Sequence, residues 1–148
     1  VAVDTSLVEH LLAGGWLPVV ASIAPGEEGE TYNVNADLAA AALAGALRAD
    51  SFVLLTDVPG VLRDARDQGS LIRELSAAQV RDLVREGAVS GGMIPKVEAC
   101  LAALAGGARE AWIADGRDGA ALEALGRGLP AGTRLVAGRA ERGAGSGV

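Results

Sequence analysis

The 148 residues make about one domain, and half of them are hydrophobic, 22% are charged and 3% are aromatic. This composition excludes pervasive disorder. The formal net charge of −6 disfavours nucleic acid and acidic membranes as partners, because their phosphates would be repelled. No apolar run reaches the roughly 20 residues of a membrane span, no signal segment is visible, and the single cysteine allows no internal disulfide, so we expect a cytoplasmic protein.

Hydrophobic periodicity predicts helices and strands that alternate along the chain. The first half is expected to contain, in order, a helix over residues 6–13, a strand over 16–23, a helix over 36–48 and a strand over 52–56. The rest of the chain is expected to contain a hairpin with its tip at 63–70, helices over 76–87 and 93–105, a strand over 111–114, a helix over 118–125 and a strand over 133–136. The Gly-rich residues 138–148 are expected to form a disordered tail.

Capping residues mark several of the predicted helix starts. Ser6 with Glu9, and Ser76 with Gln79, have the spacing of a capping box. Either Asn33 or Asn35 can cap the Ala-rich helix that follows them.

Strands that are apolar throughout and alternate with helices predict a parallel sheet with both faces covered. The expected fold class is therefore α/β, a three-layer αβα sandwich with a mainly parallel central sheet. In open sheets of this kind, ligands bind beyond the carboxyl ends of the strands. Here those ends lead into the segments 25–37, 57–60 and 115–117.

Lys96 is the first candidate for chemistry, because it is the only lysine among 13 basic residues. It follows Ser90, Gly91 and Gly92 in the first turn of a predicted helix, where free N–H groups and the helix dipole favour an anion. A lysine ammonium at such a place suits a phosphoryl group. A solvated lysine on a helix surface accounts for the same pattern, so both interpretations remain open at this point.

A second candidate cluster consists of Asn33, Asn35 and Asp37, and the two asparagines are the only ones in the chain. An ionised Asp37 in a first helical turn can orient a nearby lysine, yet all three residue types are also ordinary caps. The turn over residues 57–60 allows two interpretations as well: a tight surface turn, or the floor of a site for a nucleotide base and ribose.

Three motifs follow one another along the chain. They are Tyr-Asn-Val-Asn-Ala-Asp ending at Asp37, Leu-Leu-Thr-Asp-Val-Pro-Gly-Val-Leu ending at Leu62, and Gly-Gly-Met-Ile-Pro-Lys ending at Lys96. Together they resemble the amino acid kinase family, most closely its acetylglutamate kinase branch, and the resemblance covers residues 1–137. It implies phosphoryl transfer from ATP to the γ-carboxylate of N-acetyl-L-glutamate in arginine biosynthesis, with Mg²⁺ held mainly by the nucleotide phosphates.

The resemblance also implies roles for individual residues. Lys96 and Asp37 would be catalytic: the lysine would stabilise the transferring phosphoryl group and the aspartate would organise the catalytic lysines. Asn33 and Asn35 would bind the acyl-amino acid substrate. No residue of the chain is assigned as a metal ligand. The nucleotide site would be lined by Asp57, Val58, Pro59, Gly60, Val61, Leu62, Ala88, Val89 and Ser90.

The family's front half, with a Gly-Gly-Lys phosphate loop, a second Gly-rich loop and a substrate-binding arginine, has no counterpart in this sequence. Because the chain starts at Val1 and its only methionine is Met93, we expect a piece of a longer protein. Residues 1–137 would be its C-terminal, nucleotide-binding portion, inactive alone, and the full-length form would be a homo-oligomer. Two alternatives share the motifs: a kinase for carrier-protein-bound aminoadipate in lysine biosynthesis, and a non-catalytic nucleotide-binding module.

Overall fold

A four-stranded sheet organises the larger part of the computed structural model, which describes residues 3–137. In spatial order its strands are β3 (Phe52–Thr56), β5 (Ala111–Asp115), β6 (Thr133–Val136) and β4 (Glu74–Ser76). The pairs β3–β5 and β4–β6 are parallel, whereas β5 and β6 are antiparallel. The sheet is therefore mixed and mostly parallel.

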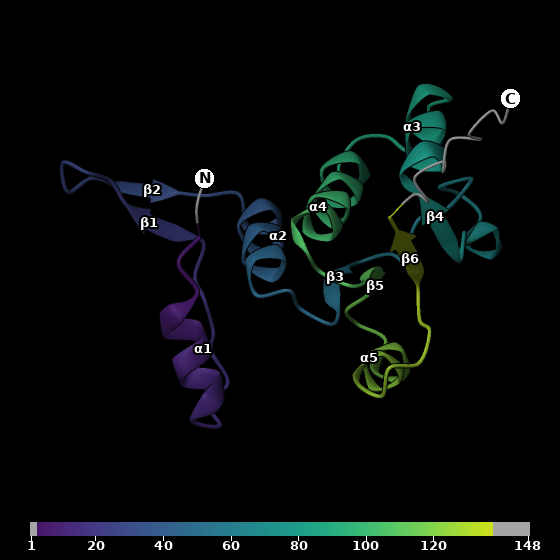
Figure 1. The fold of residues 1–148 in the computed structure, drawn as a ribbon. Coiled ribbons are helices and arrows are strands. Elements are labelled where there is room, and N and C mark those ends of the chain that lie inside the picture. The colour runs from purple at the N-terminus through teal and green to yellow at the C-terminus, as the bar shows by residue number, and fades with distance from the viewer. Residues whose placement is uncertain (1–2, 138–148) are drawn as a thin grey trace, which may run out of the picture.

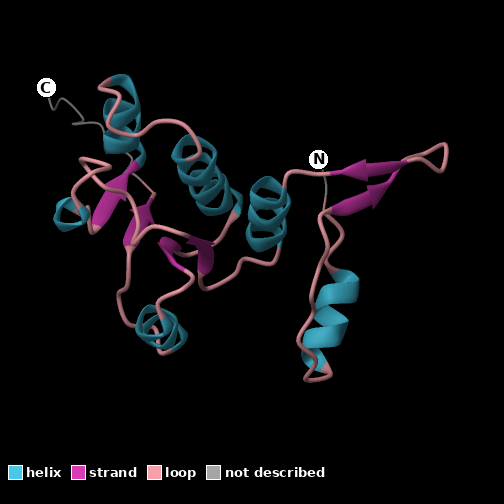
Figure 2. Ribbon diagram, turned by 180° about the vertical axis from the view of Figure 1, so that it is seen from behind, coloured by secondary structure: helices cyan, strands magenta, loops and turns pink. Residues whose placement is uncertain are grey.

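Helices cover both faces of this sheet, as Figures 1 and 2 show. On one side lie α3 (Ala77–Arg85) and α4 (Met93–Gly106), with α2 (Ala36–Ala46) packed beside α4 next to the β3 edge. On the other side lies α5 (Gly119–Gly126). The predicted class, an αβα sandwich with a mainly parallel sheet, is confirmed.

The core lies between α4 and the sheet. Ile113 of β5, Leu135 of β6 and Val97 of α4 are fully buried there. The apolar β5 is buried over its first four residues, because the helices on both faces exclude water from it. Burial of this kind supplies the main favourable term in folding.

Close contact between α2 and α4 depends on two glycines. A Cβ atom on Gly45 would lie 2.9 Å from the Cα of Gly106, nearer than a real Cβ approaches a neighbouring backbone. The absence of side chains at both positions lets the helix backbones touch at their carboxyl ends. The helices therefore sit in a fixed register, which also sets the spacing of their amino ends.

Local signals from residue 62 onward predicted the structure well. Ser76 and Gln79 form the expected capping box at the start of α3. The hairpin with its tip at 63–70 is present, closed by an antiparallel bridge between Leu62 and Leu71, and its tip contains a short 3₁₀ turn (Gln68–Ser70). The short strand β4 was not predicted.

The first third of the chain departs from the prediction. Residues 16–23 do not form a buried strand, and Trp16, Leu17 and Val19 are exposed. The short strand β1 (Ile23–Pro25) pairs with β2 (Thr31–Asn33) in a two-stranded antiparallel hairpin. An apolar run becomes a buried strand only where neighbouring strands pair with it, and the described chain offers residues 16–22 no such partner. The segment from residue 6 to residue 33, called the arm below, projects from the part of the molecule that contains the four-stranded sheet (Figure 1).

The helix α1 (Ser6–Ala13) has the predicted bounds, but its predicted capping box is wrong. Thr5, not Ser6, is the residue that precedes the helix, and its hydroxyl donates to the Glu9 carboxylate at 2.7 Å. Within residues 3–137, none of the helices has the length and apolar character needed to cross a bilayer. The predicted tail at 138–148 lies outside the described residues.

The glycine contact gives a first test of the packing. We expect Gly45→Ala to lower the free energy of unfolding by about 1–3 kcal/mol, because the new methyl group forces α2 away from Gly106. Gly126→Ala is the matched control: a Cβ there meets nothing within 4 Å, so this change should be neutral or slightly stabilising. Urea unfolding of both variants measures the difference, and equal stability would contradict the close contact.

Candidate functional site

Chain direction brings two helix starts to one edge of the sheet. Each of α2 and α4 runs back along the sheet and leads into β3 or β5, and these strands are parallel neighbours. The amino ends of both helices therefore lie near the carboxyl ends of both strands. This is the edge at which open α/β sheets bind ligands, and two positive helix ends meet there.

An ion pair joins the two helix starts. Lys96 Nζ in α4 lies 3.1 Å from Asp37 Oδ2 in α2, and the two side chains are only 25% and 24% exposed. Such a partly buried pair is screened by salt less than a surface pair is. The structure thus places the lone lysine and the predicted carboxylate together, although 59 residues separate them in sequence. Their catalytic roles stay a prediction.

A cavity of about 190 Å³ lies beside the same part of α4. Two segments distant in sequence form it, the turn after β3 and the loop before α4, and its walls are mostly apolar. Its lining residues are Val58, Gly60, Val61, Leu62, Ala65, Ala88, Val89, Ser90 and Met93. Seven of the nine residues predicted to contact the nucleotide are among them, whereas Ala65 and Met93 were not predicted.

The two remaining members of that predicted set lie elsewhere. Pro59 lines a second cavity, on the α5 side of the sheet. The Asp57 side chain is exposed and accepts a hydrogen bond from the Thr56 hydroxyl at 3.2 Å. The structure therefore separates these two side chains from the cavity wall formed by their neighbours in the same turn.

A buried hydroxyl fixes one end of the turn that forms the cavity wall. Thr133 is fully buried, and its Oγ1 accepts a hydrogen bond from the Val61 N–H at 2.8 Å and donates to the Ile72 carbonyl at 2.6 Å. Gly60 has a φ of 149°, and a Cβ there would lie 2.6 Å from the same Oγ1. Glycine is thus required at this position, both for its backbone angle and for space.

The predicted substrate-binding asparagines occupy different settings. Asn35 is the N-cap of α2, where its side chain accepts a hydrogen bond from the Leu38 N–H at 3.0 Å. Asn33 ends β2 and is exposed. The capping interpretation holds for Asn35, and a substrate contact by either residue stays a prediction.

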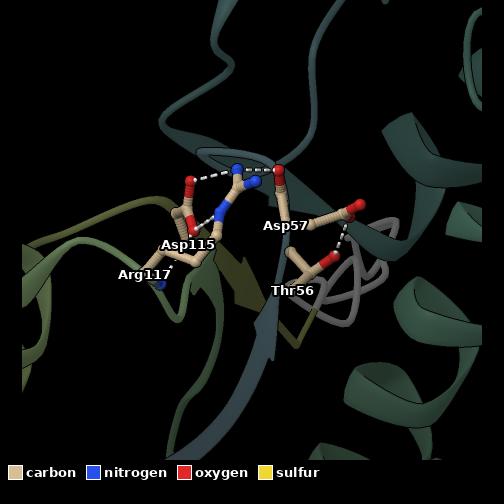
Figure 3. A network of polar contacts seen from close by, with 4 residues as sticks. All are labelled: Thr56, Asp57, Asp115 and Arg117. Atoms are coloured by element: carbon tan, nitrogen blue, oxygen red, sulfur yellow. Dashed lines mark hydrogen bonds and ion pairs between the residues drawn. The ribbon is translucent and has the colours of Figure 1, made fainter.

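At the carboxyl end of β5, a polar network connects that strand to β3 (Figure 3). The Arg117 guanidinium donates to both carboxylate oxygens of Asp115, at 2.9 and 2.8 Å, and also to the backbone carbonyl of Asp57. Hydrogen bonds from Arg117 lower the pKa of Asp115 to about 2, and the same contact raises the pKa of Arg117. Sequence reasoning placed residues 115–117 at this edge but gave them no role.

Cys100 lies one helical turn beyond Lys96 and is fully buried. Burial raises the pKa of its thiol to about 12, and the nearby Asp37 carboxylate adds to the increase. The thiol is therefore neutral under ordinary conditions. As for metals, the described residues contain no group of three or more His, Cys, Asp or Glu side chains suited to hold an ion.

Comparison with known proteins identifies the family. Residues 1–115 match the amino acid kinase family. This chain belongs to that family. Among curated members, it is 53% identical over 115 residues to acetylglutamate kinase from Pelotomaculum thermopropionicum, a stretch that covers 78% of this chain and 39% of the relative. The chain thus spans about two fifths of the length of the curated relatives that it matches.

Solved structures of amino acid kinase folds agree with this membership. An N-acetylglutamate synthase from Neisseria gonorrhoeae, complexed with coenzyme A and N-acetyl-glutamate, superposes with a TM-score of 0.78 at 28% identity, covering 90% of this chain and 30% of the synthase. Carbamate kinase from Giardia lamblia bound to AMP-PNP gives a TM-score of 0.66 at 23% identity, covering 91% of this chain and 45% of the kinase. The second likeness concerns the fold alone.

Burial of Cys100 predicts how stability changes with pH. Because folding raises the thiol pKa from 9.0 to about 12, the folded state holds this proton more tightly than the unfolded state does. We expect this contribution to be complete below pH 9 and to be lost as pH rises toward 12, at up to about 1.4 kcal/mol per pH unit. Unfolding titrations of the wild type and Cys100→Ala at pH 7 to 10.5 check this, since the variant should lack that slope. Parallel pH curves would refute it.

Proposed function

We propose that this chain is the ATP-binding portion of an acetylglutamate kinase, which transfers a phosphoryl group from ATP to the γ-carboxylate of N-acetyl-L-glutamate. The observation that carries the proposal is the Lys96–Asp37 ion pair, at the sheet edge where two helix starts meet. The adjoining cavity and the named relatives at about 50% identity support it.

In this proposal, catalysis consists of positioning and neutralisation of charge. A γ-carboxylate oxygen of the substrate attacks the γ-phosphorus of ATP, the bond to the bridging oxygen breaks, and ADP leaves. The Lys96 ammonium neutralises charge on the transferring group, and the Asp37 carboxylate keeps the ammonium in place. The positive ends of α2 and α4 favour the same anion. Mg²⁺, held mainly by the nucleotide phosphates, would neutralise further negative charge.

The adenosine end of the nucleotide is assigned to the cavity between the turn after β3 and the loop before α4. Its apolar walls, with Val58 on one side and Val89 on the other, suit a base, and neighbouring backbone groups can hydrogen-bond to it. Ser90 brings this cavity next to the start of α4, from which Lys96 extends. The triphosphate can thus run from the cavity toward the ion pair.

Fewer residues of this chain are proposed to bind the acceptor substrate than to bind the nucleotide. Asn33 would hold the acyl-amino acid from its exposed place at the end of β2. Because the chain spans 39% of its curated relative, we propose that it binds nucleotide but does not turn over alone. We further propose, from membership of this family, a homo-oligomeric full-length form and a cytoplasmic location.

Two alternatives, a kinase for carrier-bound aminoadipate and a non-catalytic nucleotide module, use the same motifs. Against the second stands the partly buried ion pair, because binding a nucleotide requires neither Lys96 nor Asp37. Against the first stand the curated relatives, which carry the name acetylglutamate kinase.

Nucleotide binding is the direct test with this chain. Calorimetric titration with Mg-ADP should show one site per chain, and Ala88→Phe, which fills the cavity, should weaken binding by about tenfold or more. Ala78→Phe, at an exposed position of α3, is the control and should bind like the wild type. If the wild type does not bind Mg-ADP, the proposed function is wrong. If Ala88→Phe binds like the wild type, the cavity is not the nucleotide site.

Turnover is tested in a chimaera, in which this chain replaces the matched stretch of the Pelotomaculum acetylglutamate kinase. We expect Lys96→Ala to lower kcat by about 10²–10³, the scale for the loss of one transition-state charge contact, with ATP affinity little changed. Lys96→Arg should also be poor, because a rigid guanidinium does not replace an ammonium here. Arg85→Ala, which removes a cation from an exposed ion pair, serves as the control. Equal losses in kcat and in affinity for Lys96→Ala would indicate a ground-state binder instead.

A further inference from the structure

We infer that Arg117 is a positioning residue for nucleotide binding, which holds the turn after β3 so that Val58 and residues 60–62 form the cavity wall. The inference rests on the proposed function, because it concerns the same cavity. It adds a residue outside the three motifs, on the loop after β5, which does not line that cavity.

The turn over residues 57–60 is held at both ends by hydrogen bonds to its backbone. At the far end, the buried Thr133 hydroxyl accepts from the Val61 N–H. At the near end, the Arg117 guanidinium donates to the Asp57 carbonyl, one residue before Val58 enters the cavity wall. These two contacts come from β6 and from the loop after β5, so the turn is fixed against the sheet itself.

Asp115 in turn fixes the guanidinium. Its carboxylate accepts from two guanidinium nitrogens and from the Arg117 backbone N–H at 2.9 Å (Figure 3). Asp115 ends β5 directly opposite Thr56, and the Gly116 N–H donates to the Thr56 carbonyl at 2.9 Å. The Asp115 carboxylate, at the end of a paired strand, therefore orients the guanidinium toward the turn after β3. A bidentate pair fixes the orientation of the guanidinium in addition to attracting it.

Arg109 provides a control that distinguishes an effect of Arg117 on nucleotide binding from an effect on the stability of the fold. Arg109 forms an ion pair with Asp50 at 2.8 Å, and its side chain is 78% exposed against 68% for Arg117, although Asp50 is 86% exposed and Asp115 only 19%. An exposed cation is screened by solvent, so the loss of either guanidinium changes stability little. The Arg109 side chain, however, bonds to Asp50 before β3 begins, away from the cavity. Loss of either arginine should therefore leave stability similar, while only loss of Arg117 should change nucleotide binding.

The experiment is calorimetric titration of this chain with adenosine, AMP and Mg-ADP, using the wild type, Arg117→Ala and Arg109→Ala. Arg117→Ala should weaken all three ligands by the same factor, about three- to tenfold, because the wall of the adenosine end is loosened. Arg109→Ala should bind like the wild type, and both variants should match it in the free energy of unfolding. Arg117→Lys, which retains one donor, should recover part of the affinity.

A double-mutant cycle with Asp115→Asn completes the test. If Asp115 acts by holding Arg117, Asp115→Asn should weaken binding alone but add nothing in the Arg117→Ala background. The inference is overturned if Arg117→Ala binds normally, if it weakens Mg-ADP but not adenosine, which means a direct phosphate contact, or if its stability falls in step with affinity. If the wild type binds none of the ligands, the proposed function itself fails, a result distinct from these three.

Discussion

The register between α2 and α4 is the constraint on which the candidate site depends. At their carboxyl ends the helices meet backbone to backbone through Gly45 and Gly106, and at their amino ends the partly buried Asp37 and Lys96 form an ion pair. A change in the helix spacing would pull this pair apart, and two charges with incomplete hydration would lose their partners. The close glycine contact and the ion pair are thus parts of one arrangement, which aims an ammonium group at the carboxyl edge of the sheet.

Many of the elements around the candidate site were predictable, because local sequence signals and tertiary packing agree in the part of the chain that contains the four-stranded sheet. The capping box at Ser76 depends on contacts within a few residues, so the sequence alone specifies it. The apolar run at residues 52–56 also forms its predicted strand, because β5 pairs with it. The three motifs led to Asp37, Lys96 and most of the cavity residues. Their spacing could not show that Val58, residues 60–62 and residues 88–90 share one cavity, because tertiary packing alone joins them.

The failures have physical causes as well. Residues 16–23 were predicted as a buried strand from apolar character alone, but burial is a property of the neighbours, and Leu17 and Val19 have none that cover them among the described residues. The strand β4 has three residues and exposes the first, so it shows too little hydrophobic pattern to be detected. Arg117 belongs to no motif, and its contact with the Asp57 carbonyl depends on the pairing of β3 with β5. The available signal was that residues 57 and 115 each follow a predicted parallel strand.

In the proposed function, the nucleotide cavity and the Lys96–Asp37 pair belong to the sheet-bearing body, whereas the proposed substrate residue Asn33 belongs to the projecting arm. The cavity wall is held by Thr133 and Arg117, both from the packed body, so its shape does not depend on the projecting arm. Asn33, in contrast, belongs to the β1–β2 hairpin, whose Ile23 and Tyr32 side chains are exposed. A residue whose support is a lone hairpin cannot hold a substrate to the fraction of an ångström that phosphoryl transfer demands. Under the proposed function, the sheet-bearing body would fix the nucleotide, while binding of the acceptor substrate would require further contacts with the arm.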